Sequence, residues 1–126
     1  MLNTDNPRNS AYPAVGLYIE LKNYEDYLIK YDFNQADLLY QILEANGIGS
    51  LPEDGSDLEI PVIIQSFELS AVEYWRTISD LPTVYLFGWE TPHEWSKICE
   101  TVNGVGPSST WLMHPFDPSK LDGGSA

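Results

Sequence analysis

The stretch GLYIELK, residues 16 to 22, places a carboxylate and an ammonium two residues apart within an apolar run. Because side chains alternate across a β-strand, Glu20 and Lys22 are expected on one face of it and the flanking leucines and isoleucine on the other. Buried charges at a strand end cost free energy unless they are paired or bind an ion. A carboxylate suits a hard divalent cation, and an ammonium suits a phosphate oxygen. The pair therefore predicts either a site for a metal and a phosphate or an ion pair on an edge strand.

The charge of the chain sets a condition on any anionic ligand. Its 126 residues carry 19 acidic and 6 basic side chains, a formal net charge of −13. This excess argues against nucleic acid and anionic membranes as partners. No stretch approaches the ~20 apolar residues of a membrane span. An anionic substrate would need a local positive site, which a divalent metal together with Lys22 would supply.

Strands and helices are expected to alternate along the chain. Apolar runs bounded by turn residues predict strands at 14–21, 60–67, 82–88 and 103–109. Helical periodicity predicts the segments between them as helices at 32–47, 68–79 and 91–102. Such alternation indicates an α/β fold with parallel strands and right-handed helical crossovers. It fits an open doubly wound sheet or part of a (β/α)8 barrel, but no Gly-rich phosphate loop opens the first helix as dinucleotide binding requires.

Capping signals predict where two of these helices begin and end. Asp32 and Gln35 have the spacing of a capping box, and Gly47 stands where a helix C-cap would. The first helix is expected to bury one apolar face, made of Leu38, Leu39, Ile42 and Leu43.

In the helix at 91–102, Thr91 is expected as the N-cap and Pro92 at the first helical position. The periodic apolar residues of this helix, expected against the sheet, are Trp95, Ile98, Cys99 and Val102. Cys99, the one cysteine of the chain, is therefore predicted to be buried and inert.

The ordered set of segments resembles the glycerophosphodiester phosphodiesterase family. GLYIELKN, PVIIQSFE, SDLPTVYLFG and NGVGPSS are similar to the family's YIEIK, IIQSFE, LPLVQL and DGIGP strands, and a helix closing on LLYQILEANGI follows the first. The resemblance runs from about Arg8 to Met113, with a polar lead at 1–12 and a polar tail at 114–126. It implies that residues 1–126 form part of a TIM-type (β/α)8 barrel, about four parallel strands alternating with three helices. They look like the fourth to seventh strands of that barrel.

The resemblance also implies a chemistry, the metal-dependent hydrolysis of glycerophosphodiesters to glycerol phosphate and an alcohol. It implies that Glu20 is a ligand of the catalytic divalent metal, Ca²⁺ or Mg²⁺, and that Lys22 faces the substrate phosphate. Phe67 is expected to face the barrel interior, where it lines the alcohol pocket or fills the core. Tyr85 is a second candidate to point inward, where it would either place a phenol near the site or fill the core, and core packing is the favoured interpretation.

Parts of the family pattern have no counterpart in this chain. These are the early HRG motif, a metal-binding glutamate and aspartate, a histidine in an HD pair and the tryptophan of the eighth strand. His93 and His114 match no catalytic histidine and are expected on the solvated surface. No catalytic acid or base is therefore assigned, and this chain alone is expected to be inactive.

Two non-catalytic interpretations stay open beside the enzyme. A half-barrel fragment or interaction module would self-associate through open strand edges at GLYIELK and NGVGP, where backbone groups lack partners. An open α/β binding domain would use Glu20 and Lys22 as a simple ion pair.

Overall fold

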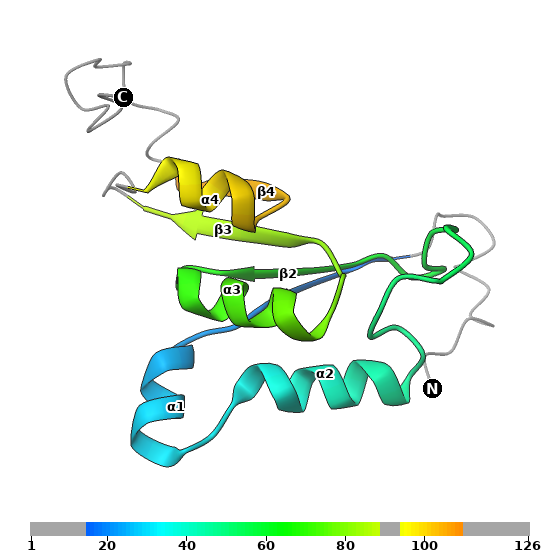
Figure 1. Cartoon of the computed structure of the whole chain (residues 1–126), viewed down its shortest axis with the longest axis horizontal. Coiled ribbons are helices and arrows are strands. Elements are labelled where there is room, and N and C mark those ends of the chain that lie inside the picture. Colours follow the sequence, from blue (N-terminus) through cyan, green and yellow to red (C-terminus); the bar gives the residue numbers. More distant parts are fainter. Residues whose placement is uncertain (1–14, 89–93, 110–126) are drawn as a thin grey trace.

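The computed structural model describes residues 15–88 and 94–109, which form an α/β unit with a parallel sheet (Figure 1). The strands are β1 (Leu17–Glu20), β2 (Val62–Ser66), β3 (Thr83–Phe87) and β4 (Gly104–Pro107). The helices are α1 (Tyr24–Tyr31), α2 (Gln35–Ala45), α3 (Leu69–Ile78) and α4 (Trp95–Thr101). The expected strands and their parallel pairing are confirmed, whereas the expected three helices are corrected to four, because α1 precedes the predicted first helix.

The strands lie in the sheet in the same order as in the sequence, β1-β2-β3-β4, and every neighbouring pair is parallel. Right-handed crossovers that all step the same way place their helices on one face of a sheet. In agreement, α3 contacts β2, β3 and each of the other helices (Figure 1). A sector of a barrel and one half of a doubly wound sheet both have this arrangement.

The two faces of the sheet differ in burial. On β2, Val62, Ile64 and Ser66 are buried against the helices, while the residues between them are half-buried. The register then assigns the opposite face, which no helix of the described residues covers. This helix-free face consists of Tyr18, Glu20, Ile63, Gln65, Val84, Leu86, Gly104 and Gly106.

The alternation predicted for β1 is confirmed. Leu17 and Ile19 pack against the buried core, and Leu21 just beyond the strand belongs to it. Tyr18, between them, is 55% exposed. The apolar residues of β1 thus anchor it to the helices, and its polar residues lie on the helix-free face.

The start of α2 differs from the predicted capping box. Asn34 is the N-cap, and its Oδ1 accepts hydrogen bonds from the backbone nitrogens of Ala36 and Asp37 at 3.0 and 3.2 Å. Asp32 instead ends α1, in the left-handed region with φ 50°. Asp32 therefore does not cap α2. It ends α1, and the extended Asn34 lies between it and the first residue of α2.

The end of α2 follows the prediction. Gly47 lies just past the helix with φ +72°, a conformation that costs glycine little. The amide of Gly47 donates to the carbonyl of Glu44, and the amide of Ile48 donates to the carbonyl of Leu43. This pair of bonds is a Schellman motif, and the buried Leu43 and Ile48 side chains belong to one core cluster.

The apolar faces predicted for two helices are confirmed only in part. On α2, Leu43 is buried and Leu39 packs against the core, but Leu38 and Ile42 are 44% and 51% exposed. On α4, Ile98 is buried and Cys99 is exposed, so the prediction of a buried thiol was wrong. Successive helical residues point about 100° apart, so a helix that buries Ile98 and packs Trp95 on Phe87 turns Cys99 toward solvent.

Candidate functional site

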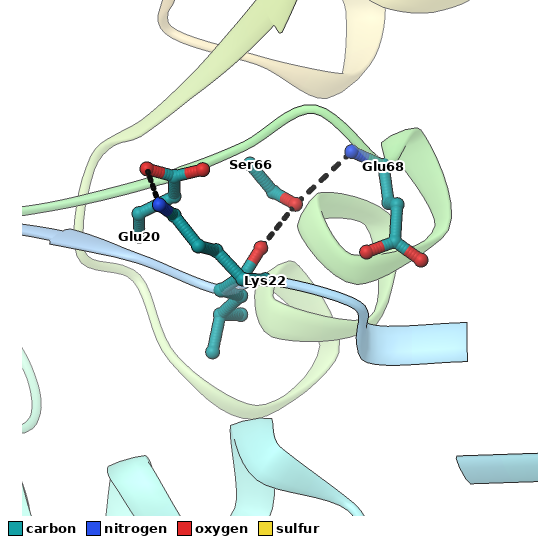
Figure 2. A network of polar contacts seen from close by, with 5 residues as sticks. Glu20, Lys22, Ser66 and Glu68 are labelled. Atoms are coloured by element: carbon teal, nitrogen blue, oxygen red, sulfur yellow. Dashed lines mark hydrogen bonds and ion pairs between the residues drawn. The ribbon is translucent and has the colours of Figure 1, made fainter. Parts of the chain in front are cut away.

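The candidate site lies at the carboxyl end of β1. Glu20 is the last residue of that strand, and Lys22 follows it after one intervening residue. The Lys22 ammonium lies 3.7 Å from a carboxylate oxygen of Glu20 (Figure 2). The structure therefore brings together the two residues that the sequence singled out.

Their exposure shows that the pair is open to solvent on the lysine side. The Glu20 side chain is 24% exposed and that of Lys22 is 72% exposed. An exposed pair at this distance contributes at most about 1 kcal/mol to folding. Stability therefore does not account for the pair, and the ammonium keeps most of its surface available to a ligand.

Gln65 in β2 and Phe67 just after β2 lie at the same end of the sheet as the pair. Gln65 is the register partner of Glu20, so two polar side chains stand side by side on the helix-free face. Phe67 follows the fully buried Ser66 and is 56% exposed. Phe67 thus lies just past the carboxyl end of β2, the end at which Gln65 pairs with Glu20.

A polar network behind the pair joins the ends of β1 and β2. The Ser66 hydroxyl donates to the carbonyl of Leu21 at 2.7 Å and accepts from the amide of Glu68 at 3.0 Å (Figure 2). Ser66 is thus a hydrogen-bond donor at the strand end that links β2 to the residue just after β1.

Glu68 has a role that the sequence analysis missed. Its two carboxylate oxygens accept the backbone amides of Tyr24 at 2.7 Å and Glu25 at 2.9 Å, the first two residues of α1. These amides have no partner within their own helix, and a carboxylate complements the positive end of the helix dipole. No sequence signal identifies such a cap, because the acid lies 44 residues from the first amide that it binds.

A metal site would need more ligands than the described residues bring together. Carboxylate oxygens are the ligands that Mg²⁺ and Ca²⁺ prefer, so the chemistry of Glu20 fits, but these ions take about six oxygen ligands. Within the ranges 15–88 and 94–109, no group of three or more His, Cys, Asp or Glu side chains is placed to hold a metal. Further ligands would have to come from outside these ranges or from water.

The position of Tyr85 differs from the expectation. Tyr85 pairs in register with the buried Ser66 and stacks on Phe87, whose ring meets Trp95 of α4. Tyr85 therefore lies on the helix-covered face, and the expectation that it points inward was wrong. His93, His114, Thr91 and Pro92 lie outside the described residues.

Comparisons with known proteins add no identification. The chain matches no protein-family model, no curated protein and no solved structure. Among the described residues, no helix is long and apolar enough to cross a membrane.

Proposed function

We propose that this chain is a sector of a (β/α)8 barrel that binds a divalent metal and a phosphodiester, and that its activity in a complete barrel is the hydrolysis of glycerophosphodiesters to glycerol phosphate and an alcohol. The observation that carries the proposal is the Glu20–Lys22 pair at the carboxyl end of a parallel strand, on the helix-free face. Active sites of such barrels are built at this end of the strands.

The helix-free face supports a barrel over a doubly wound sheet. In a doubly wound fold a second layer of helices would cover this face and would bury Glu20 and Gln65. In a barrel the same residues would line the interior near its mouth, where charged groups bind ligands. The polar neighbours Glu20 and Gln65, with Lys22 beyond them, suit the second environment better.

Each site residue has a chemical role in this proposal. Glu20 supplies one oxygen ligand to Mg²⁺ or Ca²⁺, and the bound metal would polarise the phosphate. Lys22 contacts a phosphate oxygen as a compact cation, which offsets the repulsion from a chain of net charge −13. Phe67 offers an exposed aromatic surface to the alcohol group.

A binding measurement on the full chain tests these roles. Glycerol 3-phosphate is titrated with Mg²⁺ or Ca²⁺ present, while backbone amide resonances are followed by NMR. We expect weak binding that depends on the metal and shifts the resonances around Glu20, Lys22 and Phe67. Lys22→Gln should weaken binding roughly tenfold, since it removes a contact between charged groups.

Matched variants separate a site from general electrostatics. Lys30→Gln removes the same charge from an exposed pair with Asp26 on α1, and Glu73→Gln removes a carboxylate from the pair with Lys97. Neither should change binding, whereas Glu20→Gln should abolish its dependence on the metal. Equal effects of Lys22→Gln and Lys30→Gln would contradict the proposal.

Hydrolysis by this chain alone is not expected. The resemblance assigns the acid and base to histidines of strands that this sequence does not match, and loss of acid–base catalysis typically costs ~10²–10⁴ in rate. Metal-dependent release of glycerol phosphate from glycerophosphocholine at ordinary enzyme rates by the purified chain would contradict these assignments.

A non-catalytic interaction module is the second candidate. The outer strands of the described sheet are β1 and β4, the two edges expected from the sequence. Unpaired edges favour pairing with another chain. A chain that self-associates but binds neither metal nor phosphate at Lys22 would favour this candidate.

A further inference from the structure

The turn that carries Lys22 is held from both sides by residues at the end of β2. Before Lys22, the amide of Leu21 donates to the carbonyl of Gln65 at 2.9 Å, and the carbonyl of Leu21 accepts from the buried Ser66 hydroxyl at 2.7 Å. Both backbone polar groups of Leu21 are therefore bonded to β2. This leaves the direction of the chain little freedom as it enters Lys22.

After Lys22, the chain turns into α1 through a left-handed residue, Asn23. Asn23 has φ 53° and ψ 38°, in the left-handed region that asparagine adopts more readily than most residues other than glycine. Its side chain makes no capping hydrogen bond to α1. The Glu68 carboxylate takes that place by accepting the amides of Tyr24 and Glu25. These charge-assisted bonds fix the first turn of α1 and so help to hold Asn23 in its left-handed conformation.

The two supports belong to one tripeptide. Ser66 and Glu68 face the turn and are joined by the hydrogen bond from the Glu68 amide to the Ser66 hydroxyl (Figure 2). Phe67, between them, is 56% exposed and does not take part in these contacts. The two residues that hold the Lys22 turn are therefore the ones that flank Phe67 in the sequence.

We propose that Ser66 and Glu68 are positioning residues, which hold the turn at 21–25 so that the Lys22 ammonium stays beside the Glu20 carboxylate. That this placement serves a phosphate ligand rests on the proposed function. Both oxygens of Glu68 bind amides of α1, so Glu68 acts on the site through the turn and not as a second metal ligand. Lys22 has a long and flexible side chain, and a fixed backbone limits the volume that its ammonium samples.

The first arm of the test needs no ligand. In Glu68→Gln, hydrogen exchange of the Tyr24 and Glu25 amides should accelerate roughly tenfold or more, because a neutral amide accepts these bonds less strongly. Contacts between the Lys22 and Glu20 side chains, measured as nuclear Overhauser effects, should weaken. Glu73→Gln, the same change within α3, which begins just after Glu68, should leave both measurements as in the unaltered chain. Unchanged exchange and contacts in Glu68→Gln would overturn the proposal.

The second arm measures the affinity for inorganic phosphate with Mg²⁺ present. Glu68→Gln and Ser66→Ala should each weaken binding roughly threefold to tenfold, and Glu73→Gln should not. Because the effect passes through Lys22, it should disappear when Glu68→Gln is made in the Lys22→Gln chain. A role limited to stability would not produce this dependence, and far-UV circular dichroism checks that each variant is folded.

The two arms keep this proposal separate from the proposed function. If the unaltered chain binds no phosphate, the proposed function fails, and the ligand-free arm alone decides whether Ser66 and Glu68 hold the turn. If the chain binds phosphate but Glu68→Gln behaves like Glu73→Gln, the positioning role fails and the proposed function stands.

Discussion

The hydroxyl of Tyr74 on α3 donates a hydrogen bond to the carboxylate of Asp37 on α2, with 2.5 Å between the oxygens. The bond raises the pKa of the Tyr74 phenol above its ordinary value of 10.0, and desolvation adds to the shift. The ring of Tyr74 also stacks on Tyr24 of α1, whose own phenol has a pKa raised first by burial. The Tyr74 side chain thus links α1, α2 and α3. Ionisation of its phenol at alkaline pH removes the proton that makes the hydrogen bond to Asp37.

Folding should lose stability at alkaline pH through Tyr74. Because the pKa is higher in the folded state, the stabilisation is complete below pH 10 and declines as the pH rises through the folded value. Tyr74→Phe should lower the free energy of unfolding by about 1 kcal/mol at pH 7 and make its decline above pH 10 less steep. Urea unfolding at a series of pH values measures this. Tyr31→Phe, at a tyrosine that is 69% exposed, serves as the control.

Gly49 should not tolerate a side chain. A Cβ at this position would lie 2.9 Å from the backbone nitrogen of Glu44 in α2, and a helix backbone cannot move aside cheaply. Gly49→Ala should therefore destabilise the fold by about 1–3 kcal/mol in urea unfolding. In Gly104→Ala the nearest atom, on Val84, would be 3.5 Å away, an ordinary contact. Equal costs for the two substitutions would show that the turn after α2 is packed differently.

Cys99 should react with a thiol reagent while the protein is folded. Its side chain is exposed on α4, so labelling needs no unfolding. We expect the rate in buffer to be within a few-fold of the rate in denaturant, as for an accessible thiol. Labelling that proceeds only with global unfolding would restore the buried position that the periodicity predicted.

Self-association should depend on the edge strand β4. Val105 is 45% exposed on this strand, and lysine on an edge strand opposes pairing with another chain. Val105→Lys should shift the chain toward the monomer in sedimentation velocity experiments. Ile29→Lys, the same kind of change at a residue 80% exposed on α1, should not. Association that is equally sensitive to both would place the contact away from the sheet edge.

Features set by neighbours in sequence were predictable. The alternation in GLYIELK gives two chemically distinct faces, and the structure buries Leu21 while exposing Tyr18. Gly47 was identifiable as a helix stop because the left-handed conformation favours glycine wherever it occurs. Parallel pairing followed from the alternation of strands with helices, since a crossover needs the length of a helix.

The helix α1 was not predictable in the same way. Its sequence, YEDYLIKY, has a single buried residue, Tyr24, and so no apolar stripe that periodicity would detect. Its first amides are bound by Glu68, which chain folding brings to the end of β1 from a distant position. Only the tertiary structure therefore decided that Asp32 ends one helix instead of starting the next.

The candidate site likewise has features that the sequence predicts and features that only the tertiary structure decides. The sequence by itself determined that Glu20 and Lys22 share a face at the end of a strand, because strand geometry requires it. Only the tertiary structure decided that this is the helix-free face of the sheet. It also decided that Ser66 and Glu68 hold the turn at 21–25 through hydrogen bonds. In the same way, β3 is apolar on both sides, so its alternation did not reveal where Tyr85 points, and its register with β2 assigned that residue to the helices. Local geometry follows from the order of residues, whereas the choice of face depends on which distant segments pack there.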